Sequence, residues 1–362
     1  MKPPVENLPH RRFPARRILR WLGWGAAIAV PGFAVLVVTV GYAFSGPHYD
    51  GPPSDHFDGS TFHNVPEVPR AGFWDFLKWR VTRETTPWNV RALPPGPPPP
   101  REIPRGELRV TYINHATTLV QMDAVNILTD PIWSDRTSPV SFAGPQRHHP
   151  PGLRFEDLPP IHAVVVSHNH YDHMDLPTLK RLHAAHAPRF FVGLGNSALL
   201  GGEGIDRVTE LDWWQSEVLT PDVRIHGVPA QHFSNRGLFD RNATLWLGYV
   251  IQGPEGHVVF AGDTGFGPHF SEIRRKFGPA RLAILPIGAF KPRWFMGAIH
   301  QTPEESLLAL AALGANTALA IHFGTFPLAD DTQDEPTQTL ESALSRIDGV
   351  GSQQRPRFWA LP

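Results

Sequence analysis

The sequence predicts an α+β fold of four layers, in which two β-sheets pack face to face and helices cover their outer faces. Two groups of short β runs, each followed by helices, lead to this prediction. The composition supports it, because 41% of the 362 residues are hydrophobic and 10% are aromatic, which is enough to fill a large core. We expect the fold over residues 106–362, preceded by three N-terminal segments.

The first segment, residues 1–20, is basic, and the second, residues 21–45, carries a charge-free apolar run. This run exceeds the roughly 20 residues that cross a bilayer, so we predict a single transmembrane helix as a membrane anchor. Because basic flanks stay in the cytoplasm, the rest of the chain would lie on the extracytoplasmic side. Two alternatives stay open. One is a cleaved export signal ending near Ala43-Phe44-Ser45, and the other is an amphipathic cytosolic helix.

The third segment, residues 46–105, is rich in proline, glycine and aromatic residues. It ends in the run Pro94 to Pro100, which predicts a stiff polyproline linker rather than a core element. Within it, the spacing of Trp74, Leu77 and Val81 favours one short amphipathic helix. That helix either packs on the folded body or rests on a membrane surface.

The elements of the folded domain follow from period and residue type. Residues 108–113, 118–122 and 126–129 alternate or cluster apolar and β-branched residues, which is typical of antiparallel strands. A continuous apolar strand at 163–166 and a helix at 176–184 complete the first half. The second half is expected to hold five strands and two helices, the last helix being capped by Thr302. The strands are 223–228, 245–251, 258–261, 282–287 and 318–321, and the helices are 270–277 and 303–313.

Composition also excludes several classes of function. A net charge of −1 argues against a nucleic-acid partner, because such proteins neutralise phosphates with excess basic residues. The absence of cysteine excludes disulfides, a thiol nucleophile and thiolate metal ligands. Any bound metal must therefore be held by carboxylates and by the 19 histidines.

The segment Ser167-His168-Asn169-His170-Tyr171-Asp172-His173 directly follows the buried strand at 163–166. Side chains two apart on an extended segment point the same way, so His168 and His170 can hold one ion. Asp172 and His173, on the following turn, can then reach a neighbouring ion. Burying so many titratable groups would be costly without a cation, so the pattern indicates a metal site.

The run from His168 to His173 resembles the signature of the metallo-β-lactamase superfamily, whose αβ/βα four-layer sandwich agrees with the predicted layers. The resemblance implies that His168, His170 and His232 hold one divalent ion, and that Asp172, His173 and His322 hold a second, with Asp263 bridging the two. His232, Asp263 and His322 each follow an apolar β run. Zinc is the expected metal by resemblance, and iron or manganese also suit such ligands.

Residues 111–346 are most similar to the N-acylphosphatidylethanolamine-hydrolysing phospholipase D family. The similarity lies in four stretches besides the ligand run with Tyr171. They are Leu158-Pro159-Pro160-Ile161, Glu210-Leu211-Asp212-Trp213-Trp214, residues 289–296 and His322-Phe323-Gly324-Thr325-Phe326. The chain departs from the family in its long N-terminal region, and in Asn114, which stands before His115 where glycine is more usual.

Further roles follow from the same resemblance. Asp172 and His300 are implied as catalytic residues, His300 acting on a phosphoryl oxygen or leaving group without binding metal. Asp130, at a strand end, is implied to brace the ligand loops, the alternative being a plain turn. Trp214 and Trp294 are candidates for an apolar mouth, and Arg293 for a phosphate contact. A core cluster and a surface salt bridge, respectively, would explain these three residues equally well.

The expected activity is hydrolysis of a phosphodiester. Two divalent cations lower the pKa of a shared water, so that it can attack phosphorus near neutral pH. The resemblance implies a phospholipid substrate, N-acylphosphatidylethanolamine or a relative, cleaved to phosphatidic acid and an N-acylethanolamine. Two alternatives remain. One is a lactone or carboxyl-ester hydrolase with the same chemistry, and the other is a non-catalytic envelope protein with a vestigial metal site. The sequence leaves open whether the protein forms a homodimer.

Overall fold

The structure is a computed structural model that describes residues 15–69, 71–347 and 356–361. The chain divides into two compact units. One comprises the chain up to Ser45 together with Gly237–Phe239, and the other comprises Gly46–Arg236 and Asp240–Pro362. The first unit contains helix α1 (Ala15–Phe44), and the second contains every other element.

Helix α1 covers the residues predicted as a transmembrane anchor, and Pro31 lies inside it. Across the part of the chain that the structure describes, none of the helices combines the length and the apolar character needed to cross a membrane. The transmembrane prediction for residues 21–45 is therefore not borne out. The extracytoplasmic location stays a prediction.

The first sheet contains six strands in the order β1-β2-β3-β4-β5-β6. Strands β1 to β3 pair antiparallel, and β3 to β6 pair parallel, so the sheet is mixed. The strands are β1 (Leu108–Asn114), β2 (Thr117–Met122), β3 (Val125–Thr129), β4 (Ala163–Val165), β5 (Arg189–Gly193) and β6 (Val208–Leu211). The sequence predicted the first four, and it missed β5 and β6.

The second sheet contains seven strands in the order β13-β12-β11-β10-β9-β8-β7. Strands β10 to β13 are parallel, and β7 to β10 are antiparallel, which repeats the mixed pattern of the first sheet. The strands are β7 (Ser216–Val218), β8 (Arg224–Val228), β9 (Gly248–Gly253), β10 (Gly256–Phe260), β11 (Leu282–Pro286), β12 (Thr317–Ile321) and β13 (Arg357–Trp359). The short strands β7 and β13 were not predicted.

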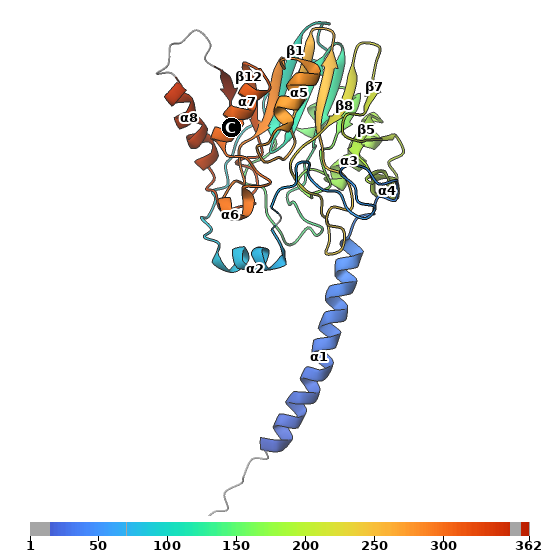
Figure 1. Ribbon diagram of the computed structural model, residues 1–362, viewed down its shortest axis with the longest axis vertical. Coiled ribbons are helices and arrows are strands. Elements are labelled where there is room, and N and C mark those ends of the chain that lie inside the picture. The colour runs from blue at the N-terminus through green and yellow to red at the C-terminus, as the bar shows by residue number, and fades with distance from the viewer. Residues whose placement is uncertain (1–14, 70, 348–355, 362) are drawn as a thin grey trace, which may run out of the picture. The chain divides into compact units, whose positions relative to one another are not determined.

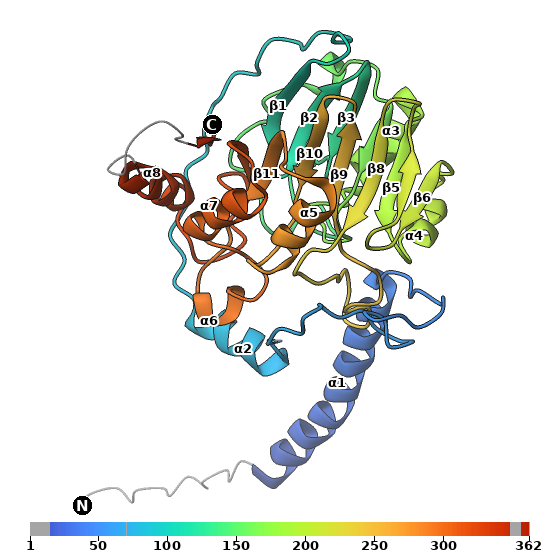
Figure 2. The same cartoon turned by 45° about the horizontal axis from the view of Figure 1, so that its top comes forward.

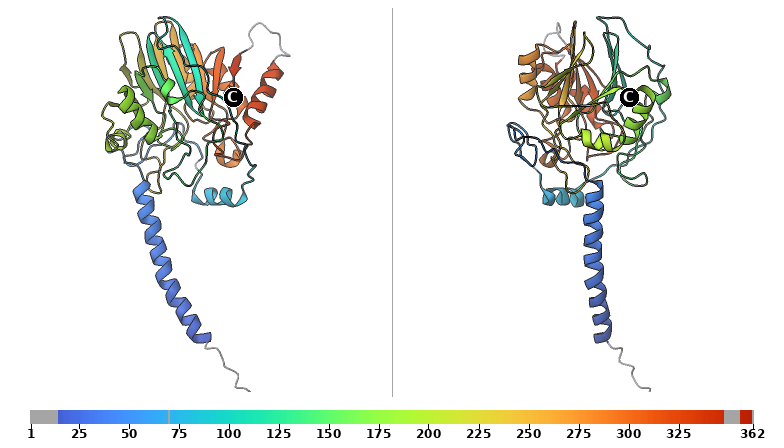
Figure 3. Two further views of the ribbon diagram at one scale, coloured as in Figure 1. Left: turned by 180° about the vertical axis from the view of Figure 1, so that it is seen from behind. Right: turned by 90° about the vertical axis from the view of Figure 1, so that its right-hand side faces the viewer.

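Helices cover the outer faces of the two sheets (Figures 1 and 2). Helices α3 (Leu176–His186) and α4 (Ser197–Gly202) lie beside the first sheet, and α5 (His269–Phe277) and α7 (Pro303–Ala312) beside the second. Seen from behind, α8 (Glu335–Ile347) lies at the opposite end of the sandwich from α3 and α4 (Figure 3). The remaining helices are α2 (Phe73–Thr82), the 3-10 turn η1 (Phe155–Asp157) and α6 (Arg293–Met296). The predicted four-layer sandwich is present.

Alternating side chains of the first sheet separate two hydrophobic cores. Val165 and Phe191 face the large core shared with the second sheet, whereas Val164 and Phe190 face a smaller core under α3. This division follows from the two-residue period of a strand, which sends neighbouring side chains to opposite faces. Because β4 is buried on both faces, its residues form a continuous apolar run in the sequence.

The expected linker at 46–105 is corrected by the structure. Phe57 and Phe62 are among the largest fully buried side chains, and both belong to the large core. Even the polyproline run is attached to the body, because Gly96 N donates to Gly152 O over 2.7 Å and Pro100 O accepts from Gln121 Nε2. Burial of aromatic side chains outweighs the low strand and helix propensity of this segment, so it packs as irregular chain.

Candidate metal centre

The predicted donors lie at the carboxyl ends of strands that run in one direction. His168, His170, Asp172 and His173 follow β4, His232 follows β8, Asp263 follows β10, and His322 follows β12. Strand β8 runs parallel to β10 because both are antiparallel to β9, and β10, β11 and β12 are parallel neighbours. The pairing therefore brings His232, Asp263 and His322 to one edge of the second sheet, where their donor atoms lie close to those that follow β4.

The first donor group consists of His168, His170 and His232, whose ring nitrogens lie within 4.8 Å of one another. His168 Nε2 is 2.7 Å from His170 Nδ1, which is 3.4 Å from His232 Nε2. The outer nitrogens of two rings are already occupied. His168 Nδ1 lies 2.9 Å from Ser167 Oγ, and His232 Nδ1 lies 3.0 Å from Ile299 O. These contacts leave the inner nitrogens of both rings as lone-pair donors toward a shared point.

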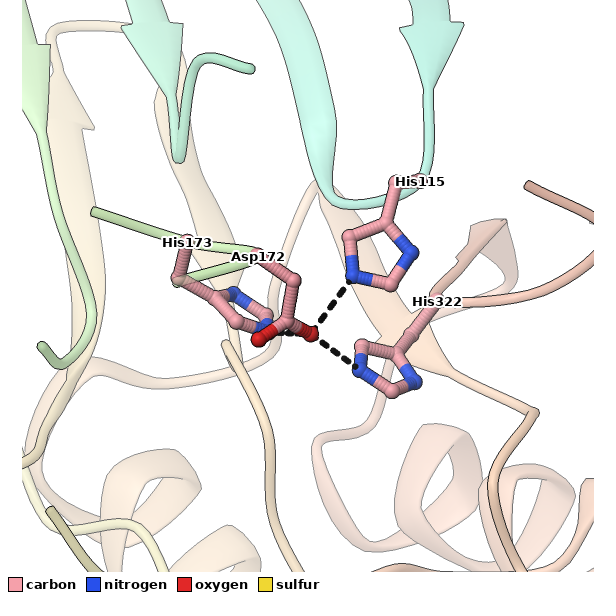
Figure 4. Close-up of side chains that lie close together, drawn as sticks. All are labelled: His115, Asp172, His173 and His322. Carbon is pink, nitrogen blue, oxygen red and sulfur yellow. Dashed lines mark hydrogen bonds and ion pairs between the residues drawn. The ribbon is translucent and has the colours of Figure 1, made fainter. Parts of the chain in front are cut away.

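The second donor group contains Asp172, His173 and His322, together with His115 (Figure 4). Asp172 Oδ2 lies 3.1 Å from His173 Nε2 and 3.3 Å from His322 Nε2. All of these side chains are buried. His322 has a φ of 61°, a strained backbone conformation that is held where the surrounding structure demands it.

Asp263 lies between the two groups, as the bridging role implies. Its Oδ2 is 3.0 Å from His322 Nε2 and 3.2 Å from His173 Nε2 in the second group. The same oxygen is 3.8 Å from His232 Nε2 in the first. One carboxylate therefore reaches both sets of imidazoles.

Sequence reasoning missed His115, which sits in the turn between β1 and β2. Its Nε2 lies 2.9 Å from Asp172 Oδ2, and its side chain is 1% exposed. Its backbone ties the turn to the loop of His322, because His115 N donates to Thr325 Oγ1 and His115 O accepts from His322 N. The available signal was a polar Asn114-His115 pair directly after the apolar residues Tyr112 and Ile113.

Asp130 supports the ligand loop in the way that the sequence implied. Its Oδ1 accepts from Ser167 N over 2.7 Å, and its Oδ2 accepts from Ser167 Oγ and His173 Nδ1, each over 2.6 Å. Because His173 Nδ1 is held by this carboxylate, His173 Nε2 faces the cluster. Asp130 is fully buried, which keeps these contacts out of water.

Asn64, which was not predicted, supports His232 in a similar way. Asn64 Nδ2 donates to His232 O over 2.9 Å, and Asn64 Oδ1 accepts from His232 N over 3.1 Å. Trp246 Nε1 donates to the same Asn64 oxygen. The segment expected to be a linker thus supplies a residue that positions a predicted metal ligand.

The protonation states of the first donor group suit a cation. Burial lowers the pKa of His170 to about 4 and holds the pKa values of His168 and His232 well below the ordinary value. All three rings are therefore neutral near pH 7. Neutral imidazoles with converging lone pairs are the form in which histidine binds metal.

In the second group, histidines and carboxylates compensate one another. Burial by itself would raise the pKa of Asp172 and of Asp263, but the charge of His173, together with hydrogen bonds from the neighbouring histidines, outweighs it and holds both values well below the usual range. Burial likewise opposes protonation of His322, but Asp263 and Asp172 raise its pKa to about 9. Two buried carboxylates thus demand positive charge at this point, and a divalent cation is of the right sign and is suited to the same donor atoms.

Comparison with known proteins identifies the family to which this chain belongs. A profile of the beta-lactamase superfamily domain matches residues 125–323, more than half of the chain. The chain belongs to the metallo-β-lactamase superfamily. Within this superfamily, the chain is 41% identical over 231 residues to N-acyl-phosphatidylethanolamine-hydrolyzing phospholipase D 1 of Caenorhabditis elegans, covering 61% of the chain and 65% of that protein. It is also 38% identical over 292 residues to an uncharacterised protein of Mycobacterium tuberculosis, covering 75% and 77% of the two chains.

A solved structure has a similar fold. The isothiocyanate hydrolase from Delia radicum gut bacteria superposes with a TM-score of 0.54 at 20% identity, covering 70% of this chain and 96% of that one. At this identity, the likeness concerns the fold alone. The nematode phospholipase is matched over slightly less than two thirds of its own length.

His300 lies beside the carboxylate of Asp263. Its Nδ1 is 4.0 Å from Asp263 Oδ2, and its ring centroid is about 5 Å from those of His232 and His322. Burial lowers the pKa of His300 to about 3, so the ring is neutral. His300 was predicted to act without binding metal. One of its ring nitrogens nevertheless lies within 4.8 Å of a donor atom of His232 and of Asp263, so the three could hold one ion.

Arg293 follows the alternative explanation that the sequence left open, a salt bridge. Arg293 Nη2 lies 3.0 Å from both carboxylate oxygens of Glu305, and Nη1 donates to His300 O over 2.7 Å. A guanidinium held by two carboxylate oxygens and a carbonyl has few donors left for a phosphate. The structure therefore places Arg293 as a support for the backbone of His300.

The two predicted tryptophans contact residues other than the metal donors. Trp294 is 50% exposed and has Lys78 Nζ 4.6 Å above its ring. Trp214 is in the turn between β6 and β7, where its amide donates to Gly227 O and Lys276 lies over its ring. Trp214 also packs on the large core, in agreement with the core alternative.

A cavity of about 760 Å³ borders the ligand loop of the superfamily fold. Tyr171, Met174 and Arg236 contribute to its wall, and Arg236 lies 3.9 Å above the Tyr171 ring. The residues that line it do not include the predicted metal ligands. The cavity is therefore beside the ligand loop and not over the donor cluster.

Proposed function

We propose that the protein is a dinuclear metal-dependent phosphodiesterase of the phospholipase D type. On this proposal, it cleaves N-acylphosphatidylethanolamine or a related phospholipid into phosphatidic acid and an N-acylethanolamine. The observation that carries the proposal is the position of Asp263 Oδ2, 3.0 Å from His322 Nε2 and 3.8 Å from His232 Nε2. Two donor groups that share one carboxylate are suited to a pair of divalent cations.

The nematode relative supports the choice of substrate. That protein is named for hydrolysis of N-acylphosphatidylethanolamine, and it is 41% identical to this chain over 231 residues. A yeast relative with the same named activity is 32% identical over 237 residues. Other relatives with similar identity are uncharacterised, so the phospholipid substrate belongs to the proposal and the metal-dependent hydrolase chemistry has the broader support.

Divalent cations bound to these donors would supply an activated water and polarise the phosphoryl oxygen. The chain's own residues orient the reaction. Asp172, held through Oδ2 by His115, stays ionised and accepts hydrogen bonds from the reacting water. His300, neutral and beside Asp263, donates a hydrogen bond to a phosphoryl oxygen or to the leaving group.

The test is a substrate panel run on one purified sample whose metal content is measured. We expect about two equivalents of metal per chain and turnover of both N-acylphosphatidylethanolamine and bis(p-nitrophenyl) phosphate. Asp263→Asn should lower both the metal content and the turnover. If only an acyl-homoserine lactone is hydrolysed, the protein is a carboxyl-ester hydrolase. If less than one equivalent is bound and metal addition restores no hydrolysis, the non-catalytic alternative holds.

A further inference from the structure

Helix α2 presents its apolar face away from the body of its unit. Trp79 is the buried residue of this helix. Phe73, Leu77 and Val81, spaced four residues apart, are 70%, 41% and 78% exposed, and Trp74 beside them is 75% exposed. Residues four apart share one face of a helix, and Trp79 projects from nearly the opposite side. We call Phe73, Trp74, Leu77 and Val81 the α2 surface.

The buried side of α2 is fastened to α6, next to the candidate metal centre. Trp79 stacks on Phe295 with ring centroids 5.2 Å apart, and Trp79 Nε1 donates to Asp330 Oδ2. The two helices lie side by side in Figures 1 and 2. Met296, at the end of α6, accepts a hydrogen bond from His300 N. The α2 surface is thus joined through one layer of side chains to a residue beside the donors.

The charges of α2 favour an anionic partner. Asp75 is satisfied locally, since its carboxylate accepts from Gly72 N over 2.8 Å. Lys78 and Arg80 are exposed on the same helix, and Lys78 extends over Trp294. A short helix with aromatic and aliphatic residues on one face and basic residues at its flanks is the pattern of an interfacial membrane helix.

A second copy of the chain is a poor occupant of this surface. A ten-residue helix is about 15 Å long, and its four exposed side chains offer on the order of 500 Å². A stable protein interface needs about 800 Å² on each partner. A bilayer has no such requirement, because shallow insertion of a few side chains below the headgroups suffices.

We propose that the α2 surface docks on an anionic lipid bilayer and holds the catalytic unit against the membrane. Docking stands independently of the proposed chemistry. Only its consequence for turnover rests on the proposed phospholipase function. In that case, the surface brings the site to a substrate whose acyl chains remain in the bilayer.

The absence of cysteine from the chain makes a site-specific test direct. Single variants Phe73→Cys and Val81→Cys of the full chain receive a nitroxide label. Leu308→Cys on α7, also an exposed apolar position at 55%, is the matched control. Vesicles of three parts phosphatidylcholine to one part phosphatidylglycerol are added, and accessibility to oxygen and to a water-soluble nickel chelate is measured. The measurement reports the surroundings of each label. Vesicle binding through helix α1 alone would therefore leave the accessibility of the α2 labels unchanged.

We expect both α2 labels to lose nickel accessibility several-fold and to gain oxygen accessibility, and the Leu308 label to stay unchanged. Vesicle binding without a change at α2 overturns the proposal, and so does absence of vesicle binding. If the α2 labels become protected on raising protein concentration without vesicles, a second copy covers the surface and the proposal is wrong.

Turnover separates docking from chemistry. Phe73→Ser/Val81→Ser should lower hydrolysis of vesicle-borne N-acylphosphatidylethanolamine about tenfold more than that of soluble bis(p-nitrophenyl) phosphate, since two exposed apolar side chains can no longer insert into the bilayer. Leu308→Ser should leave the ratio of the two rates as in the parent. An unchanged ratio in the double variant contradicts a role of docking in turnover. If the parent hydrolyses neither substrate, the proposed function fails and the label experiment still decides docking.

Discussion

His115 links two loops of the donor cluster through a contact that spans 57 positions of sequence. Its Nε2 is 2.9 Å from Asp172 Oδ2, and it is grouped with the second set of donors (Figure 4). Groups that orient metal ligands are often as important as the ligands, and their loss lowers metal affinity about 10- to 100-fold. We therefore assign His115 a positioning role toward Asp172.

Replacement of His115 tests this role. His115→Ala should weaken binding of the second equivalent of zinc about 10- to 100-fold and leave the first equivalent, at His168, His170 and His232, unaffected. His115→Gln carries an amide donor near the position of Nε2 and should restore much of the affinity. Calorimetric titration of the metal-free protein measures both steps. Equal binding of both equivalents by the alanine variant would contradict the assignment.

His56 is the clearest pH-dependent contact away from the donors. Its Nε2 lies 2.7 Å from Asp212 Oδ1, and its ring stacks on Trp213. Burial lowers the pKa of His56, but the hydrogen bonds to Asp212 and Asp55 outweigh it and raise the pKa above its ordinary value of 6.5. The contacts of protonated His56 with Asp212 and Asp55 therefore contribute fully to the free energy of unfolding below pH 6.5. This contribution is lost as pH rises through the raised pKa of His56.

Urea unfolding of the metal-loaded protein at pH 6 and pH 9 tests this linkage. His56→Asn should lower the free energy of unfolding more at pH 6 than at pH 9, because the charged pair exists only at the lower pH. Val65→Ala, an exposed position in the same segment that carries no titratable group, is the control and should show no such difference. A His56→Asn effect that is equal at both pH values would show that the imidazolium is not involved.

Helix α7 begins with a capping box that also connects to the candidate site. Thr302 Oγ1 accepts from Glu305 N over 3.1 Å, and Glu305 Oε2 accepts from Thr302 N over 2.8 Å. Glu305 also holds Arg293 of α6. One carboxylate therefore fixes the start of α7 and the end of the segment that carries His300.

Loss of this cap has a defined cost. Thr302→Ala should lower the free energy of unfolding by about 1 kcal/mol, and Thr302→Ser should retain most of it because serine is an equally good cap. Chemical denaturation of the three proteins in parallel measures the difference. A threonine-to-alanine variant as stable as the parent would mean that neighbouring contacts hold α7 without the cap.

At the scale of the whole molecule, the segment before the superfamily domain is part of the catalytic unit. Phe57 is 1% exposed in the large core, although it lies outside the residues 125–323 that match the domain profile. Phe57→Ala should therefore lower the free energy of unfolding by about 3–5 kcal/mol. Val90→Ala, at an 80% exposed position, is the control and should change little. Equal stability of the two variants would show that the segment is dispensable.

The sequence by itself determined the sandwich and most of the candidate ligands. Apolar runs with the period of strands and helices predicted the elements, and His168, His170, Asp172 and His173 stand close together after one of them. The more distant donors His232, Asp263 and His322 were predicted only through the resemblance to the superfamily. They follow strands β8, β10 and β12. Strands β5 and β6 were missed, and both are short, at five and four residues.

Only the tertiary structure decided which partners surround those ligands. His115 reaches Asp172 across 57 positions, Asn64 reaches His232 across 168, and Arg293 is taken by Glu305. Local patterns report period and turn chemistry, whereas these contacts depend on which loops meet once the strands pair. For the same reason, a proline-rich segment that has the composition of a linker fills part of the core: its buried phenylalanines gain their stability only against strands far along the chain.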